Sequence, residues 1–141
     1  MVINKGFKIV ELPVYDGNIA GEEKELISRS INYKGELAVL SVSSSNYIAY
    51  VNFTLNGVAR GNHYHLKKKE YVYIGRGRVL GSFKKYDEED ITTVEIKEGS
   101  LITIEPLWTH AFKTIEEGFA IEFSPTKYEE MSNDTFKDII L

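Results

Sequence analysis

Hydrophobic and polar residues alternate in short runs along most of this 141-residue chain. Turn residues separate the runs at intervals of about 8–12 residues, a spacing typical of all-β sandwiches and barrels. Helical periodicity is scarce between the two ends. The runs expected to form strands cover residues 7–14, 36–42, 47–55, 70–74, 78–86, 91–96, 101–104, 111–115 and 119–123. The pattern therefore predicts an all-β domain.

The connections and the chain ends carry more specific signals. Gly75-Arg-Gly77 predicts a turn, and Glu116-Glu117-Gly118 predicts a hairpin between the last two strands. Residues 22–28 fit either a helical turn or a strand edge. Asn133 is a suitable N-cap, so residues 133–140 are expected to form a short closing helix.

Composition narrows the class of protein. A chain of this length is most simply one domain, residues 1–141. The absence of cysteine excludes disulfides and thiolate chemistry, so a metal site would use nitrogen and oxygen ligands. A net charge of -4 argues against a nucleic-acid partner. Neither a signal peptide nor an apolar stretch of about 18 residues is evident, which predicts a cytoplasmic protein with no membrane partner.

All three histidines, His63, His65 and His110, lie in two short segments. In a strand, His63 and His65 face the same side. An antiparallel return would bring Glu70 back beside them, while His110 must come from another strand. Three imidazoles and a carboxylate suit Zn, Ni, Fe, Mn or Co. An isolated His-x-His is more often a surface or core feature, so the longer spacing matters.

That spacing resembles a known pattern. The glycines, histidines and glutamate of the first segment match the first signature motif of the cupin superfamily, at Gly57, His63, His65, Glu70 and Gly77. The second segment is similar to the second cupin motif at Gly99, Pro106 and His110, although Thr114 stands where asparagine is expected.

The resemblance covers about residues 35–125. It implies a cupin-type double-stranded β-helix, that is, a jelly-roll barrel, with His63, His65, Glu70 and His110 as metal ligands. It also implies a homodimer. The apolar strand edges at residues 8–10 and 47–55 favour the same assembly, because such edges need cover.

The residues beside the first motif narrow the activity. Arg60-Gly61-Asn62-His63 resembles a segment of sugar-nucleotide cupins, which include deoxysugar 3,5-epimerases, 3,4-ketoisomerases and the cupin half of bifunctional capsular-polysaccharide enzymes. The resemblance implies a nucleotide-linked keto sugar as substrate. It also implies epimerase- or isomerase-type proton transfer in polysaccharide or deoxysugar synthesis.

This chemistry needs a base, an acid and a group that stabilises the enolate. His63 or His65 suits the base, since the pKa of histidine lies near working pH. The other candidates are Tyr71 and Tyr73 as proton donors, Arg60 for the enolate or the diphosphate, Lys67 for added positive charge, and Trp108 for stacking on a ring. Each also has a structural alternative: a solvated lysine turn, strand-forming tyrosines, or a tryptophan packed under the barrel rim.

Two hypotheses compete for the same histidines. A histidine that binds a metal has committed its lone pair and cannot also be a free base. Either a divalent metal is bound and other groups move the proton, or no metal is bound and the histidines act as acid and base. Two further functions stay open: a metal-dependent cupin oxygenase or isomerase acting on a non-nucleotide substrate, and a non-catalytic sugar-binding cupin.

Overall fold

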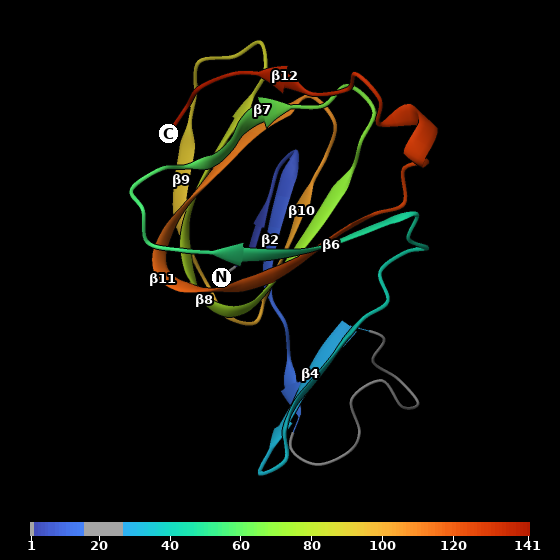
Figure 1. Cartoon of the computed structure of the whole chain (residues 1–141), viewed down its shortest axis with the longest axis vertical. Coiled ribbons are helices and arrows are strands. Elements are labelled where there is room, and N and C mark those ends of the chain that lie inside the picture. Colours follow the sequence, from blue (N-terminus) through green and yellow to red (C-terminus); the bar gives the residue numbers. More distant parts are fainter. Residues whose placement is uncertain (1, 16–26) are drawn as a thin grey trace.

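The computed structural model describes residues 2–15 and 27–141 (Figure 1). It confirms the all-β prediction, because this part of the chain forms strands and a single 3-10 turn, Tyr128–Glu130. No helix in the same residues is long and apolar enough to cross a membrane. The strands are β1 (Val2–Asn4), β2 (Phe7–Glu11), β3 (Val14–Tyr15), β4 (Ile27–Asn32), β5 (Gly35–Leu40), β6 (Tyr47–Phe53), β7 (Arg60–Tyr64), β8 (Glu70–Lys85), β9 (Thr92–Lys97), β10 (Ser100–Ile104), β11 (Trp108–Ser124) and β12 (Phe136–Lys137).

The two longest strands, β8 and β11, organise the barrel. They pair with each other along their length, but each changes its other neighbour halfway. Residues 70–73 of β8 pair with β10, whereas residues 78–83 pair with β9. Residues 110–112 of β11 pair with β7, whereas residues 118–124 pair with β6. One nine-stranded sheet therefore folds into two facing layers, β1-β2-β10-β8-β11-β6 and β9-β8-β11-β7-β12, which is the jelly-roll arrangement.

The bend in this strand pair corrects two predictions. The turn at Gly75-Arg-Gly77 and the hairpin at residues 116–118 both lie inside continuous strands. The β11–β8 register shifts between residues 114 and 120, which marks β-bulges. Gly77 has φ 87°, and a Cβ there would lie 2.6 Å from the Glu116 carbonyl oxygen. The turn-like residues therefore bend two paired strands and do not end them.

The predicted helix at residues 133–140 is wrong. This part of the chain contains β12, which pairs with β7 through Phe136 opposite Tyr64 and Lys137 opposite His63. Asn133 adopts a left-handed conformation, with φ 57°. Pairing with β7 gives this backbone the partners that a helix would otherwise supply. Of residues 22–28, residues 22–26 lie outside the described residues, and residues 27 and 28 begin strand β4.

Alternation along β8 separates two packed regions. Val72 and Ile74 face the barrel interior, whereas Tyr71 and Tyr73 face outward against a separate three-stranded sheet of β3, β4 and β5, which lies below the barrel in Figure 1. The interior cluster comprises Phe7, Ile9, Phe53, Val72, Ile74, Val79, Phe83, Ile96, Ile102, Ile104 and Ala120. Burial of these side chains holds the two layers together, and some of them also line a cavity between the layers.

Candidate functional site

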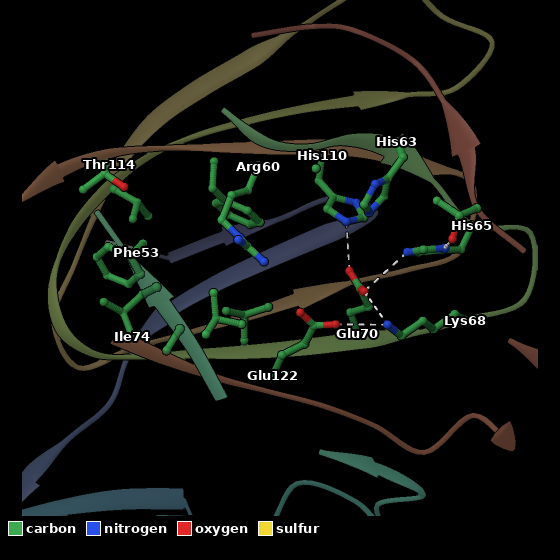
Figure 2. A pocket seen from close by; sticks show the side chains of 17 residues that line it. Phe53, Arg60, His63, His65, Lys68, Glu70, Ile74, His110, Thr114 and Glu122 are labelled. Atoms are coloured by element: carbon green, nitrogen blue, oxygen red, sulfur yellow. Dashed lines mark hydrogen bonds and ion pairs between the residues drawn. The ribbon is translucent and has the colours of Figure 1, made fainter. Parts of the chain in front are cut away.

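A cavity of about 240 Å³ lies between the two layers of the barrel (Figure 2). Its two ends differ in chemistry. The polar end is lined by His63, His65, Lys68, Glu70, His110 and Glu122, and the apolar end by Val51, Phe53, Val72, Ile74, Val79, Phe112 and Ala120. Arg60 points into the space between the two ends.

Three strands bring the predicted histidines and glutamate together. His63 on β7 pairs directly with His110 on β11. His65 is the first residue after the end of β7. Glu70 is the first residue of β8. The centroid of the His63 ring lies 4.9 Å from the centroid of the His65 ring and 4.9 Å from that of the His110 ring. The four residues therefore converge, but not by the predicted antiparallel return: β7 and β8 are not paired, and Glu70 faces the histidines from the other layer.

Glu70 lies at the centre of this cluster and is 4% exposed. One carboxylate oxygen lies 2.9 Å from Nε2 of His110, and the other lies 2.8 Å from Nζ of Lys68. Nε2 of His65 is 3.3 Å from Glu70 as well, but the geometry is that of an electrostatic contact without a hydrogen bond. Burial disfavours the charged form, but the positive and hydrogen-bonding neighbours outweigh it and hold the pKa of Glu70 well below its ordinary value.

Backbone carbonyls set the orientation of two imidazoles. Nδ1 of His65 lies 2.7 Å from the Asp134 carbonyl oxygen, and Nδ1 of His110 lies 3.0 Å from the Trp108 carbonyl oxygen. A carbonyl oxygen can only accept a hydrogen bond, so both Nδ1 atoms carry the proton. Nε2 of each ring is therefore the atom left to act on Glu70 or on a ligand.

Neighbouring histidines have opposite pKa shifts. Burial, followed by the charges of His110 and His65, lowers the pKa of His63 to about 4. Burial alone would lower the pKa of His110 too, but the charge and hydrogen bond of Glu70 raise it above its ordinary value. The two pKa shifts therefore favour an unprotonated His63 beside a protonated His110.

The three histidines fit a divalent metal. Their candidate ligand atoms all lie within 4.8 Å of one another. Nε2 of His65 is buried without a hydrogen-bond partner among the described residues. Imidazoles that bind metals commonly donate the other ring N–H to a carbonyl, as His65 and His110 do. Glu70 fits less well as a fourth ligand, because Lys68 and His110 both hold its carboxylate, whereas His110 would have to release Glu70 alone.

Two cavity residues, Lys68 and Glu122, were missed by the sequence analysis. Nζ of Lys68 lies 3.0 Å from the carboxylate of Glu122 and 4.5 Å from the centre of the Tyr47 ring. Alternation along β11 could have identified Glu122, because Ala120 faces the interior and Glu122 is two residues further along. Local sequence carries no such signal for Lys68, which lies in a turn.

Four other predicted residues do not line the cavity. Tyr71 and Tyr73 point outward, since Glu70, Val72 and Ile74 occupy the inner face of β8. The Tyr73 hydroxyl donates a hydrogen bond to Glu36 of the small sheet. This placement does not suit the predicted catalytic roles of the two tyrosines.

Lys67 and Trp108 are also positioned away from the cavity. Lys67 is exposed, and its neighbour Lys68 turns inward in its place. The Trp108 ring packs against the interior cluster, with its centroid 5.5 Å from that of Phe7. Of the residues predicted to bind substrate, only Arg60 lines the cavity.

The folded-over β8–β11 pair and the histidine–carboxylate cluster inside the barrel are those of a cupin. The chain belongs to the polysaccharide biosynthesis C-terminal domain family, whose model matches residues 14–136. The predicted membership of the cupin superfamily is thereby confirmed. No curated protein matches the sequence.

Solved structures share the fold at low sequence identity. The sugar 3,4-ketoisomerase QdtA from Thermoanaerobacterium thermosaccharolyticum, in complex with TDP, is 15% identical, with 96% of this chain and 90% of that chain covered and a TM-score of 0.72. A 3,4-ketoisomerase from Helicobacter canadensis is 13% identical, with 94% and 90% covered and a TM-score of 0.71. The capsular polysaccharide assembling protein CapF from Staphylococcus aureus is 14% identical, with 83% of this chain but 35% of that chain covered and a TM-score of 0.61. At these identities the likeness establishes the fold.

Proposed function

We propose that this protein is an isomerase that moves a proton on the carbon next to the carbonyl of a nucleotide-linked keto sugar, in polysaccharide or deoxysugar synthesis. The observation that carries the proposal is the placement of His63 beside the His110–Glu70 pair in one cavity: His110 lies 2.9 Å from Glu70, and the rings of His63 and His110 are 4.9 Å apart. The family supports the pathway, and the fold is shared with QdtA, which has been solved with TDP-4-keto-6-deoxyglucose.

His63 is the best candidate for the base. A keto group acidifies the neighbouring C–H bond, so a nearby lone pair can remove that proton and leave an enolate. With its pKa at about 4, His63 is free to accept a proton at neutral pH. The His110–Glu70 pair holds a second proton beside it, which suits the return of a proton to the neighbouring position.

Arg60 is the candidate for stabilising the enolate. Its side chain lines the cavity, and no hydrogen bond or ion pair joins it to another described residue. A guanidinium offers several N–H donors in a fixed plane, which suits a developing oxyanion. Its position between the histidines and the apolar end favours the sugar carbonyl over the diphosphate.

The cavity is sized for the sugar and not for the nucleotide. Pockets that enclose drug-sized ligands measure about 300–1,000 Å³. This cavity measures about 240 Å³, so the nucleotide would lie outside its mouth.

A divalent metal, whether Zn, Ni, Fe, Mn or Co, would be held by His63, His65 and His110. When bound, it would supply Lewis-acid polarisation of the keto oxygen. Under that condition the three imidazoles could not serve as bases. Glu122 would then be the candidate cavity group for proton transfer, since burial and the nearby Glu70 raise its pKa.

Isotope exchange tests the proposal directly. The protein is incubated in deuterated water with nucleotide-linked 4-keto sugars, and the sugar is followed by NMR. We expect deuterium beside the carbonyl or a shifted ketone, with His63→Asn at least about 100-fold slower. Tyr71→Phe is the matched control, because Tyr71 faces outward and the rate should persist.

Elemental analysis of the same preparation decides between the metal and metal-free forms. The absence of both deuterium incorporation and ketone shift would overturn the proposal. Oxygen uptake on iron loading without nucleotide binding would favour the oxygenase alternative. Sugar binding without turnover would favour a binding protein.

A further inference from the structure

The C-terminal segment, residues 133–141, lies along the strand that carries His63. Its strand β12 pairs with β7, with Lys137 opposite His63 and Phe136 opposite Tyr64. Figure 1 shows β12 beside β7 at one end of the barrel. The Tyr64 and Phe136 rings stack with centroids 5.4 Å apart. The segment is therefore in direct contact with the outer edge of the proposed site.

Asp134 attaches this segment to the turn that follows His65. Its carboxylate accepts backbone N–H bonds from three successive residues: Leu66 at 2.9 Å, Lys67 at 3.1 and 3.3 Å, and Lys68 at 2.9 Å. Asp134 is 5% exposed, so these bonds are shielded from water. The carboxylate therefore fixes the backbone conformation that turns the Lys68 side chain into the cavity.

The main chain of the same residue holds the imidazole. The Asp134 carbonyl accepts the Nδ1–H bond of His65 at 2.7 Å, which turns Nε2 towards Glu70. One residue thus controls two groups around Glu70: the His65 ring through its carbonyl, and Lys68 through its carboxylate.

A second anchor lies on the other side of His63. The Asn62 side chain accepts bonds from the backbone N–H groups of Ile140 at 2.8 Å and Leu141 at 3.1 Å, and donates to the Leu141 carbonyl at 3.1 Å. The Asn62 carbonyl accepts the Asp138 N–H at 2.8 Å. The pairing of β12 with β7 would be enough to close the barrel. The additional bonds of Asn62 and Asp134 lie on either side of His63 and His65 along the chain.

We propose that Asp134 is a positioning residue for the site, which fixes His65 as its Nδ1–H tautomer and places Lys68 against Glu70. Its effect on turnover rests on the proposed function, but its effect on His65 does not. A merely structural role for Asp134 would leave the tautomer of His65 unchanged when Asp134 is altered in a folded protein.

The first test uses the unaltered protein. Histidine ring nitrogens are labelled with ¹⁵N, and the tautomers are assigned by NMR in chelator at about pH 8, above the ordinary imidazole pKa of roughly 6.5. We expect His65 to carry its proton on Nδ1. A proton on Nε2, or an even mixture of the two tautomers, would overturn the proposal without any variant.

The second test compares Asp134→Asn with Asp138→Asn. An asparagine at 134 keeps one acceptor oxygen and turns an NH₂ group towards the backbone N–H groups of the turn. This repulsion should displace residue 134 and move its main-chain carbonyl away from Nδ1 of His65, so the ring should become a mixture of tautomers. The kcat for keto sugars should fall about 10- to 100-fold, with KM within about two-fold. Asp138 contacts Thr109 and Lys84 instead of the turn, so its variant should keep the His65 tautomer.

The outcomes separate the two proposals. A folded Asp134→Asn protein with an unchanged His65 tautomer overturns the positioning role. If the unaltered protein has no keto-sugar activity but His65 behaves as expected in both variants, the positioning role stands and only the proposed function fails.

Discussion

At the scale of single residues, one contact with a carboxylate gives two neighbouring imidazoles opposite pKa shifts. His63 and His110 are paired across neighbouring strands, and both are partly or fully removed from water. Glu70, 2.9 Å from His110, raises the pKa of His110, whereas burial and then the neighbouring imidazoles lower the pKa of His63. The carboxylate therefore assigns the acid and the base within one cluster.

This difference predicts a pH dependence of stability. An unfolded histidine has a pKa of about 6.5, whereas folded His63 has a pKa of about 4. Between these values the unfolded state binds more protons, so stability should rise with pH from about 4 to about 6.5. His63→Asn should flatten this rise in melting temperature, measured by circular dichroism in chelator.

The control for this prediction is His110→Asn, which should change the dependence of stability on pH at the alkaline side and not at the acid side. The pKa of His110 is raised, so its contribution is complete below about 6.5 and is lost as pH rises through its folded pKa. Removing it also leaves Glu70 without that partner, so the protein should be less stable throughout. An acid limb that stays equally steep in His63→Asn would contradict the assigned shift.

Period-two alternation predicted that His63 and His65 face the same side of their segment, but the predicted antiparallel return of Glu70 beside them is wrong. Strand β7 pairs with β11 and β12, and Glu70 reaches the histidines from the facing layer. Alternation also says nothing about the neighbouring lysines. It could not select Lys68 over Lys67 as the lysine that enters the cavity. That choice depends on the turn held by Asp134, far away in the chain. Contacts between residues distant in sequence have no signature in the local pattern.

At the scale of elements, most strands of the barrel were predicted in place, but β1 and β12 were not predicted, and β8 and β11 were divided where they bend. Glycines and charged residues at 75–77 and 116–118 have the composition of turns, yet β8 and β11 continue through them. Bulges and turns use similar residues. A segment is a bulge when its strand stays paired with the neighbouring strand on both sides of the bend, which the local sequence does not show. The helix predicted from Asn133 failed for a similar reason, since pairing with β7 overrides a weak local preference.

Tyr73→Phe tests the connection between the small sheet and the barrel. The Tyr73 hydroxyl bonds to Glu36 on β5, which also pairs with Arg29 on β4 at 2.7 Å. Loss of this hydrogen bond should lower the free energy of unfolding by about 1 kcal/mol, as measured by urea denaturation. Tyr33→Phe is the control, because Tyr33 is 94% exposed. Turnover should be unchanged, and a ten-fold loss would instead restore the predicted catalytic role of Tyr73.

At the scale of the whole molecule, strand β6 suggests how two copies associate. Within the described part of the chain, β6 pairs only with β11, so its other edge carries no sheet partner. Ile48 and Tyr50 on this strand are 70% and 64% exposed. An apolar edge strand invites pairing with another chain. A second copy related by two-fold symmetry would cover both edges at once.

We therefore expect a homodimer with β6 in its interface. Light scattering at micromolar concentration should give twice the 16.1 kDa mass of the chain. Ile48→Glu should shift the protein to monomer, because two carboxylates would be brought into an apolar interface. Ile139→Glu is a matched control, since Ile139 is 67% exposed and lies in the C-terminal segment, away from β6. A monomeric unaltered protein, or an Ile48→Glu variant that stays dimeric, would exclude this interface.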